Sequence, residues 1–183
     1  MDIKKFKVLG DLQHTNSDLN REFEQRFVIL KRNIIENDKK IIIKYFNDNE
    51  IKTRDEVSRI VAGYGQSYLT VKLSNPEDNF IGANMRYEIE IKAGNVYEYY
   101  LLAVLLDRSK SVIVETTSKN ELTQKDEIDK EISEFEERNR RLKLLIENMN
   151  TYQVTYQIYK GHSLETLIKK SDNLIEVLSE IFN

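Results

Sequence analysis

The apolar residues of this chain change their spacing twice, and the spacing predicts helices near both ends with strands between them. The first stripe steps by three and four residues, which is typical of one helix face. Its members are Leu19, Phe23, Phe27, Leu30 and Ile34. We expect this helix over about 17–46, after a short strand over 3–9. A capping box that begins at Thr53 predicts a second helix, which ends at Gly63.

In the middle of the chain the apolar period falls to two, as in half-buried strands. The alternation predicts strands over 69–73 and 85–92, with a turn at 74–79 between them, and another strand at 112–114. The segment 96–106 is apolar throughout, so its pattern does not distinguish a buried strand from a buried helix. The strands follow one another closely, which favours an antiparallel meander.

The last third of the chain carries a heptad seam over 122–149. Its members are Ile128, Ile132, Phe135, Asn139, Leu142, Ile146 and Met149. In such a seam, a polar residue like Asn139 specifies the register and the number of helices. The alternative is that the helix curves away and leaves this amide in water. A strand over 152–158 and a final helix after Ser163 complete the pattern.

Together these elements predict a single α+β domain over 1–183. We expect an antiparallel sheet of about four to six strands, with a central meander, packed on helices. The helices over 17–46 and 122–149 are long enough to form an antiparallel arm.

Composition narrows the function. Hydrophobic residues make up 40% of the chain and charged residues 32%, which is typical of a globular protein. The formal net charge of −3 argues against a protein that coats nucleic acid generally. The absence of cysteine excludes disulfides and thiolate chemistry. The N-terminal residues lack a signal-peptide pattern and no apolar run could span a bilayer, so we expect a cytoplasmic protein that does not contact a membrane.

One triad has the residue types of a metal-dependent site: Asp78, Glu90 and Lys92. The triplets that end at Asp78 (Pro-Glu-Asp) and at Lys92 (Glu-Ile-Lys) resemble the motif of the PD-(D/E)xK nucleases. The resemblance implies Mg²⁺ held by Asp78 and Glu90, and a water positioned by Lys92. It also implies an αβββαβ core in which 96–106 is a helix. Two features depart from the motif: Glu77 separates the proline from the aspartate, and Glu90 and Lys92 lie on the polar side of an alternating strand.

The remaining features favour binding. Tyr97, Tyr99 and Tyr159 are candidate interface residues, because a tyrosine buries a large area and keeps one polar group. Core packing on the sheet is the alternative for these rings. In the heptad seam, Phe135, Asn139 and Leu142 are the candidate contacts for another helix, including one from a second copy of the chain.

We therefore expect a non-enzymatic protein-binding or structural module that needs no cofactor. Its partner would be a protein, and the acidic net charge would steer a basic region of that partner. Abundant Ile, Lys and Asn indicate an AT-rich genome, which suits a phage or mobile-element inhibitor of a host protein, or an assembly component. A Mg²⁺-dependent nuclease is the alternative.

Overall fold

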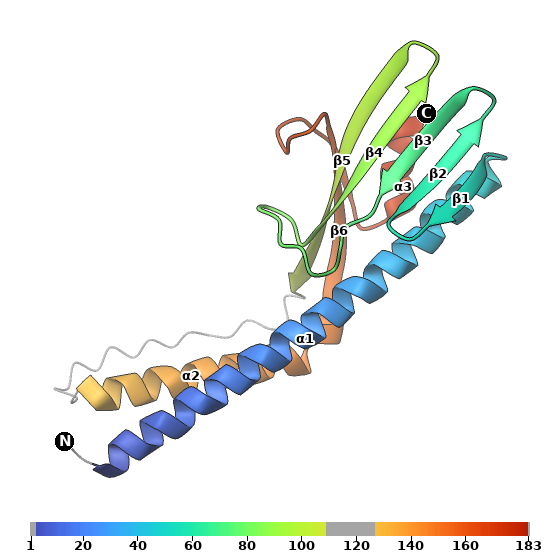
Figure 1. The fold of residues 1–183 in the computed structure, drawn as a ribbon. Helices are drawn as coiled ribbons and strands as arrows, with labels where there is room; N and C mark the ends of the chain where they lie inside the picture. The colour runs from blue at the N-terminus through green and yellow to red at the C-terminus, as the bar shows by residue number, and fades with distance from the viewer. Residues whose placement is uncertain (1–2, 109–126, 183) are drawn as a thin grey trace. The chain divides into compact units, whose positions relative to one another are not determined.

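The computed structural model describes residues 3–108 and 127–182 (Figure 1). The chain divides into two compact units, and each is built from two separate stretches of sequence. The helical unit comprises Met1–Phe27 and Arg108–Thr151, and the sheet unit comprises Val28–Asp107 and Tyr152–Asn183. Helix α1 (Ile3–Asp48) contributes to both units. The strand predicted at 112–114 lies outside the described residues.

In the helical unit, α2 (Glu127–Glu147) lies beside the first part of α1, and a 3-10 turn (Met149–Thr151) follows it. Lys5 Nζ is 2.7 Å from Asp129 Oδ2, and Asn16 Nδ2 donates a hydrogen bond of 2.8 Å to Asn139 Oδ1. The contacts advance together along both helices, so the helices run parallel, and the predicted antiparallel direction is wrong. Antiparallel neighbours follow from a short connecting loop, whereas the described residues between these two helices already form five strands.

The two parallel helices carry apolar stripes of identical spacing. The stripe of α1 comprises Leu9, Leu12, Asn16, Leu19 and Phe23, and that of α2 comprises Ile132, Phe135, Asn139, Leu142 and Ile146. Each residue of α2 in this list lies 123 positions after its counterpart, as the bonded pair Asn16 and Asn139 does. Asn139 is only 5% exposed, and its Nδ2 also donates to the carbonyl oxygen of Leu12. The amide is therefore buried in the seam and is not left in water.

The strand predicted over 3–9 is wrong, because α1 already begins at Ile3. The helical spacing of the stripe extends back through Leu12 to Leu9, which is buried. A single continuous stripe outweighs the strand preference of a few residues. The helix ends after Asp48, where Glu50 adopts a positive φ of 61° and the amide of Ile51 bonds back to the carbonyl of Phe46.

The sheet unit contains a seven-stranded antiparallel meander in which the strands lie in chain order (Figure 1). The strands are β1 (Lys52–Glu56), β2 (Arg59–Tyr64), β3 (Ser67–Lys72), β4 (Met85–Ala93), β5 (Val96–Arg108), β6 (Tyr152–Lys160) and β7 (Leu167–Ser171). The α+β class and the meander are confirmed, and the sheet has more strands than the expected four to six.

Three local predictions need correction or a decision. The helix predicted from Thr53 to Gly63 is wrong: this stretch forms the β1–β2 hairpin, in which Ile60 and Ala62 are buried at alternate positions. The ambiguous segment 96–106 is strand, and its central residues are buried on both faces, which explains its continuous apolar run. After Ser163 the chain forms β7 before the last helix, α3 (Leu174–Phe182).

Helices cover one face of the sheet (Figure 1). The second part of α1 places Asp38 against tyrosines of β4 and β6, and Lys39 Nζ lies 2.6 Å from Asp55 of β1. In α3, Leu174, Val177 and Leu178 are buried, and the ring of Phe182 packs on Phe46 of α1 at 5.4 Å between centroids. This covered face holds the core of the sheet unit. Among the described helices, none is long and apolar enough to cross a membrane.

Candidate functional site

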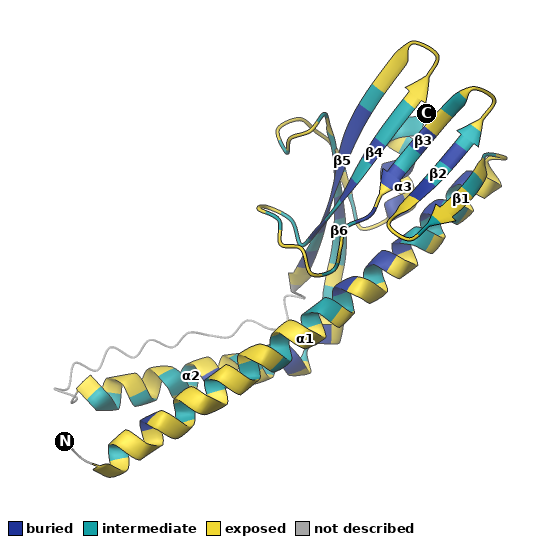
Figure 2. Ribbon diagram, viewed as in Figure 1, coloured by how far each residue is buried: buried dark blue, intermediate teal, exposed yellow. Residues whose placement is uncertain are grey.

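The opposite face of the sheet is polar and solvent-accessible over β1 to β4 and the tip of β5. Directly paired residues of neighbouring strands share a face, so the strand register identifies its members. They are Lys52, Arg54, Glu56, Arg59, Val61, Tyr68, Thr70, Lys72, Glu88, Glu90, Lys92 and Tyr97. All twelve are exposed or half-buried, and on β2 and β3 they alternate with buried residues, which Figure 2 colours dark blue. We call this set the open face.

The last row of the open face combines aromatic rings and cations. Tyr68 of β3, Lys92 of β4 and Tyr97 of β5 are paired directly across the three strands. Tyr68 is 44% exposed and Tyr97 is 60% exposed. Lys92 Nζ lies 5.7 Å from the centroid of the Tyr68 ring, within the range of a cation–π contact. The two tyrosines are two strands apart, which separates their backbones by about 10 Å. We call these three residues, together with Lys52 at the β1 end, the end row.

The charges of the open face are distributed unevenly. Glu56 pairs with Arg54 and Arg59, and Lys72 lies 3.4 Å from Glu88. These pairs belong to the rows nearer the opposite end of the strands, so positive and negative groups there are close to balance. No ion pair within the described residues involves the two lysines of the end row. The end row is therefore the cationic part of this face.

Tyr99 marks the boundary of the open face on β5. It is 9% exposed, and its ring stacks on His162 with 3.6 Å between centroids. The amide of Gly161 also donates to the carbonyl oxygen of Tyr99 at 2.8 Å. Burial raises the pKa of the Tyr99 hydroxyl to about 12, and the nearby Glu88 carboxylate contributes to that rise. The Arg86 side chain opposes part of the rise; Arg86 precedes the residues of β4 that pair with β3. The predicted interface residue Tyr99 is thus mostly covered by the β6–β7 loop of its own chain.

The predicted metal triad is divided between two places. Glu90 and Lys92 lie on the open face, where Glu90 is flanked by Thr70 and Tyr99. Asp78 lies in the loop after β3, and its carbonyl oxygen accepts a hydrogen bond from Lys31 Nζ at 2.9 Å. Within the described residues, no group of three His, Cys, Asp or Glu side chains could hold a metal ion.

The secondary structure also differs from the order that the nuclease resemblance implies. Every element between residues 52 and 108 is a strand, including the segment for which an αβββαβ core requires a helix.

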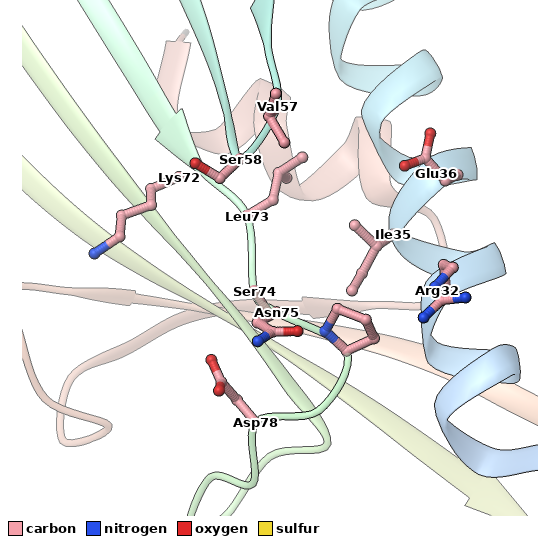
Figure 3. A pocket seen from close by; sticks show the side chains of 11 residues that line it. Arg32, Ile35, Glu36, Val57, Ser58, Lys72, Leu73, Ser74, Asn75 and Asp78 are labelled. Carbon is pink, nitrogen blue, oxygen red and sulfur yellow. The ribbon is translucent and has the colours of Figure 1, made fainter. Parts of the chain in front are cut away.

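Asp78 lines a pocket of about 540 Å³ between α1 and the loop that follows β3 (Figure 3). Ile35 and Leu73 belong to its apolar wall, and Arg32 and Glu36 project from α1 at its rim. Its lining residues are Arg32, Ile35, Glu36, Val57, Ser58, Lys72, Leu73, Ser74, Asn75, Pro76 and Asp78. Two basic and two acidic side chains leave this lining without a net charge, so its chemistry does not select an ion.

A buried carboxylate links α1 to the sheet. Asp38 is fully buried and accepts hydrogen bonds from the hydroxyls of Tyr87 at 2.7 Å and Tyr156 at 2.6 Å. Burial raises the pKa of Asp38 to about 6, and the two tyrosine hydrogen bonds oppose part of that rise. This cluster was not expected from the sequence. The available signal was the spacing of four that places Asp38 between Ile34 and Ile42 on one helix face.

The remaining predicted interface residues have partners within the chain. In the seam, Phe135 and Leu142 are half-buried, and the Arg138 guanidinium lies 5.3 Å from the centroid of the Phe135 ring. Tyr159 is half-buried and donates to Gln157 Oε1 at 2.6 Å. Of the three tyrosines named from the sequence, Tyr97 is the most accessible.

Tyr68 was not among the site residues expected from the sequence. The alternation of β3, which places Tyr68 on the same side as Thr70 and Lys72, was the signal for its position on the polar face.

No family model, curated protein or solved structure matches this chain.

Proposed function

We propose that this protein is a non-enzymatic protein-binding module that contacts its partner through the open face. The observation that carries the proposal is the end row, where Tyr68 and Tyr97 are accessible on either side of Lys92. The described helical segments of the sheet unit pack on the opposite face, so Tyr68 and Tyr97 are not part of the core that these helices cover.

The physical properties of the end row suit a protein contact. Tyrosine supplies a large contact area with few rotatable bonds and keeps a hydroxyl for hydrogen bonding. Residues on paired strands are held by the ladder, so binding costs less conformational entropy than binding through a loop does. Aromatic anchors of this kind carry much of the binding energy in many interfaces.

The acidic groups of the open face favour a protein over a nucleic acid. Glu56, Glu88 and Glu90 lie among the basic residues of this face, where a phosphate backbone would meet three carboxylates. A nucleic-acid site needs a continuous positive track along the strand it binds. A protein surface can instead match an alternation of both signs.

The biological setting is also part of the proposal. The codon bias indicated by abundant Ile, Lys and Asn supports an origin in an AT-rich genome, including that of a phage or mobile element. In that setting, inhibition of a host protein or a part in an assembly is the role that we propose for the open face.

Capture of partners from a nuclease-treated extract of the source cells, with quantitative mass spectrometry, tests this function. The test variant is Tyr68→Ala with Tyr97→Ala. The matched control is Tyr64→Ala, because Tyr64 is 74% exposed at the β2–β3 hairpin but follows Gly63 and so alternates to the other side.

We expect one or more proteins to be recovered with the wild type and with the control, and to be lost with the double variant. Equal recovery with all three forms would show that the open face is not the binding site.

A further inference from the structure

We infer that the partner segment bound by the end row is acidic and carries an aromatic or aliphatic side chain. This inference rests on the proposed function of the open face and adds the chemistry of the partner. It differs from the expectation drawn from net charge alone, which pointed to a basic partner region.

The local charge of the open face is opposite in sign to that of the whole chain. The open face has five basic residues (Lys52, Arg54, Arg59, Lys72 and Lys92) and three acidic ones (Glu56, Glu88 and Glu90), so its excess is two positive charges. The formal charge of the chain is −3. A partner responds to the potential of the face that it approaches, and beyond a Debye length the other charges are screened.

The positive excess is concentrated beside the two accessible rings. The middle row holds one basic residue, Arg54, and one acidic residue, Glu90, and the third row holds two of each kind. The end row holds Lys52 and Lys92 and no acidic residue. The cations that lack an acidic counterpart in their row are therefore the two that share a row with Tyr68 and Tyr97.

The geometry of the end row suggests how such a segment binds. An apolar side chain of the partner fits over Lys92, between rings whose backbones are about 10 Å apart. The Lys92 ammonium lies over the Tyr68 ring, where a neighbouring carboxylate can reach it. A second carboxylate reaches Lys52, which is paired with Gly63 on the far side of Tyr68. Lys92 between the two rings, with Lys52 two strands beyond Tyr68, thus selects an acidic residue near the anchor.

A second copy of this chain is a poorer occupant. Two open faces that met symmetrically would carry the same excess of positive charge, and surfaces of like net charge repel. The open face therefore favours a different chain with complementary charge.

Fluorescence anisotropy with polymers of defined composition tests the inference directly. The probes are labelled random copolymers of glutamate with tyrosine and of lysine with tyrosine, and a single-stranded oligothymidylate. The test variant is Lys52→Glu with Lys92→Glu. The control variant, Lys7→Glu with Lys143→Glu, makes the same change in net charge at exposed lysines of α1 and α2, which lie in the helical unit and outside the sheet. Circular dichroism checks that each variant is folded.

We expect the glutamate–tyrosine copolymer to bind the wild type and the control, and its affinity to fall by about tenfold in the test variant. Added salt weakens this binding. Tighter binding of the lysine–tyrosine copolymer or of the oligothymidylate overturns the inference. So does an affinity for the glutamate–tyrosine copolymer that the test variant retains in full.

Failure of the inference is distinguishable from failure of the proposed function. A cellular partner that depends on Tyr68 and Tyr97, yet binds the Lys52→Glu with Lys92→Glu variant normally, would leave the binding function standing and exclude an acidic segment. A partner that is insensitive to both pairs of substitutions would exclude the open face itself.

Discussion

The buried carboxylate of Asp38 makes the stability of the sheet unit depend on pH, and the change Asp38→Asn tests this. Asparagine has nearly the same shape and no charge. Its amide can still accept a hydrogen bond from one tyrosine and donate one to the other. The substitution therefore removes the ionisation while it keeps the contacts with Tyr87 and Tyr156.

The expected magnitude follows from the shift in pKa. Burial raises the pKa of Asp38 from 3.8 to about 6 in the folded protein. The folded state therefore binds the proton more tightly than the unfolded state does. The stabilisation from this proton is complete below the unfolded pKa and is lost as the pH rises through the folded pKa. Two pKa units correspond to about 3 kcal/mol, of which about 2 kcal/mol falls between pH 4.5 and pH 7.5.

Urea denaturation followed by circular dichroism measures this effect at a series of pH values. The quantity of interest is the unfolding free energy of Asp38→Asn minus that of the wild type, because other titrating groups cancel in the difference. We expect the difference to rise by about 2 kcal/mol from pH 4.5 to pH 7.5, so that the variant gains on the wild type. Asp11→Asn, at an exposed carboxylate of the same helix, is the control, and its difference should stay within about 0.5 kcal/mol.

Two results would refute the reasoning about Asp38. A difference that stays constant with pH would mean that the carboxyl group does not titrate near pH 6 in the folded state. A difference that falls as the pH rises would mean that the protein stabilises the ionised form, as a buried cation near Asp38 would. The first result would remove the buried carboxylate as a source of pH dependence, and the second would reverse the sign of its contribution.

Three further predictions concern packing and the open face. The double change Asn16→Leu with Asn139→Leu should raise the melting temperature and add species above monomer mass in light scattering. The single change Asn139→Leu should instead lower the stability of the protein, because it leaves the half-buried Asn16 amide without that partner. Phe46→Ala should cost about 3–5 kcal/mol in urea denaturation, because the ring is 1% exposed and packs on Phe182; a loss below about 1 kcal/mol would contradict that packing. Tyr68→Ala with Tyr97→Ala should change stability by about 1 kcal/mol or less, and a larger loss would assign these rings to the fold.

The elements predicted correctly are those whose pattern is long and has one period. The alternation over 69–73, 85–92 and 152–158 predicted strands, and the structure has β3, β4 and β6 there. The heptad seam over 122–149 predicted a helix, which the structure describes from Glu127 to Glu147. In these segments a single face is apolar, so local pattern and tertiary burial agree.

Where the pattern is short or uniformly apolar, tertiary contacts determined the secondary structure. The capping box at Thr53 predicted a helix, yet pairing with β3 and burial of Ile60 and Ala62 make the segment a hairpin. The run 96–106 has no period because both of its faces are buried, so only the neighbouring strands decided that it is a strand.

The candidate site depended on the fold in a different way. The sequence by itself determined that Glu90 and Lys92 lie on a polar strand face and that a polar residue interrupts the α2 seam. Only the tertiary structure decided that Tyr68 and Tyr97 flank Lys92, and that Asn139 bonds to Asn16 of a parallel helix. The spacing of apolar residues in the sequence assigns a side chain to a face of its own strand or helix. Neighbours across strands and helices depend on register and direction, which contacts between distant parts of the chain determine.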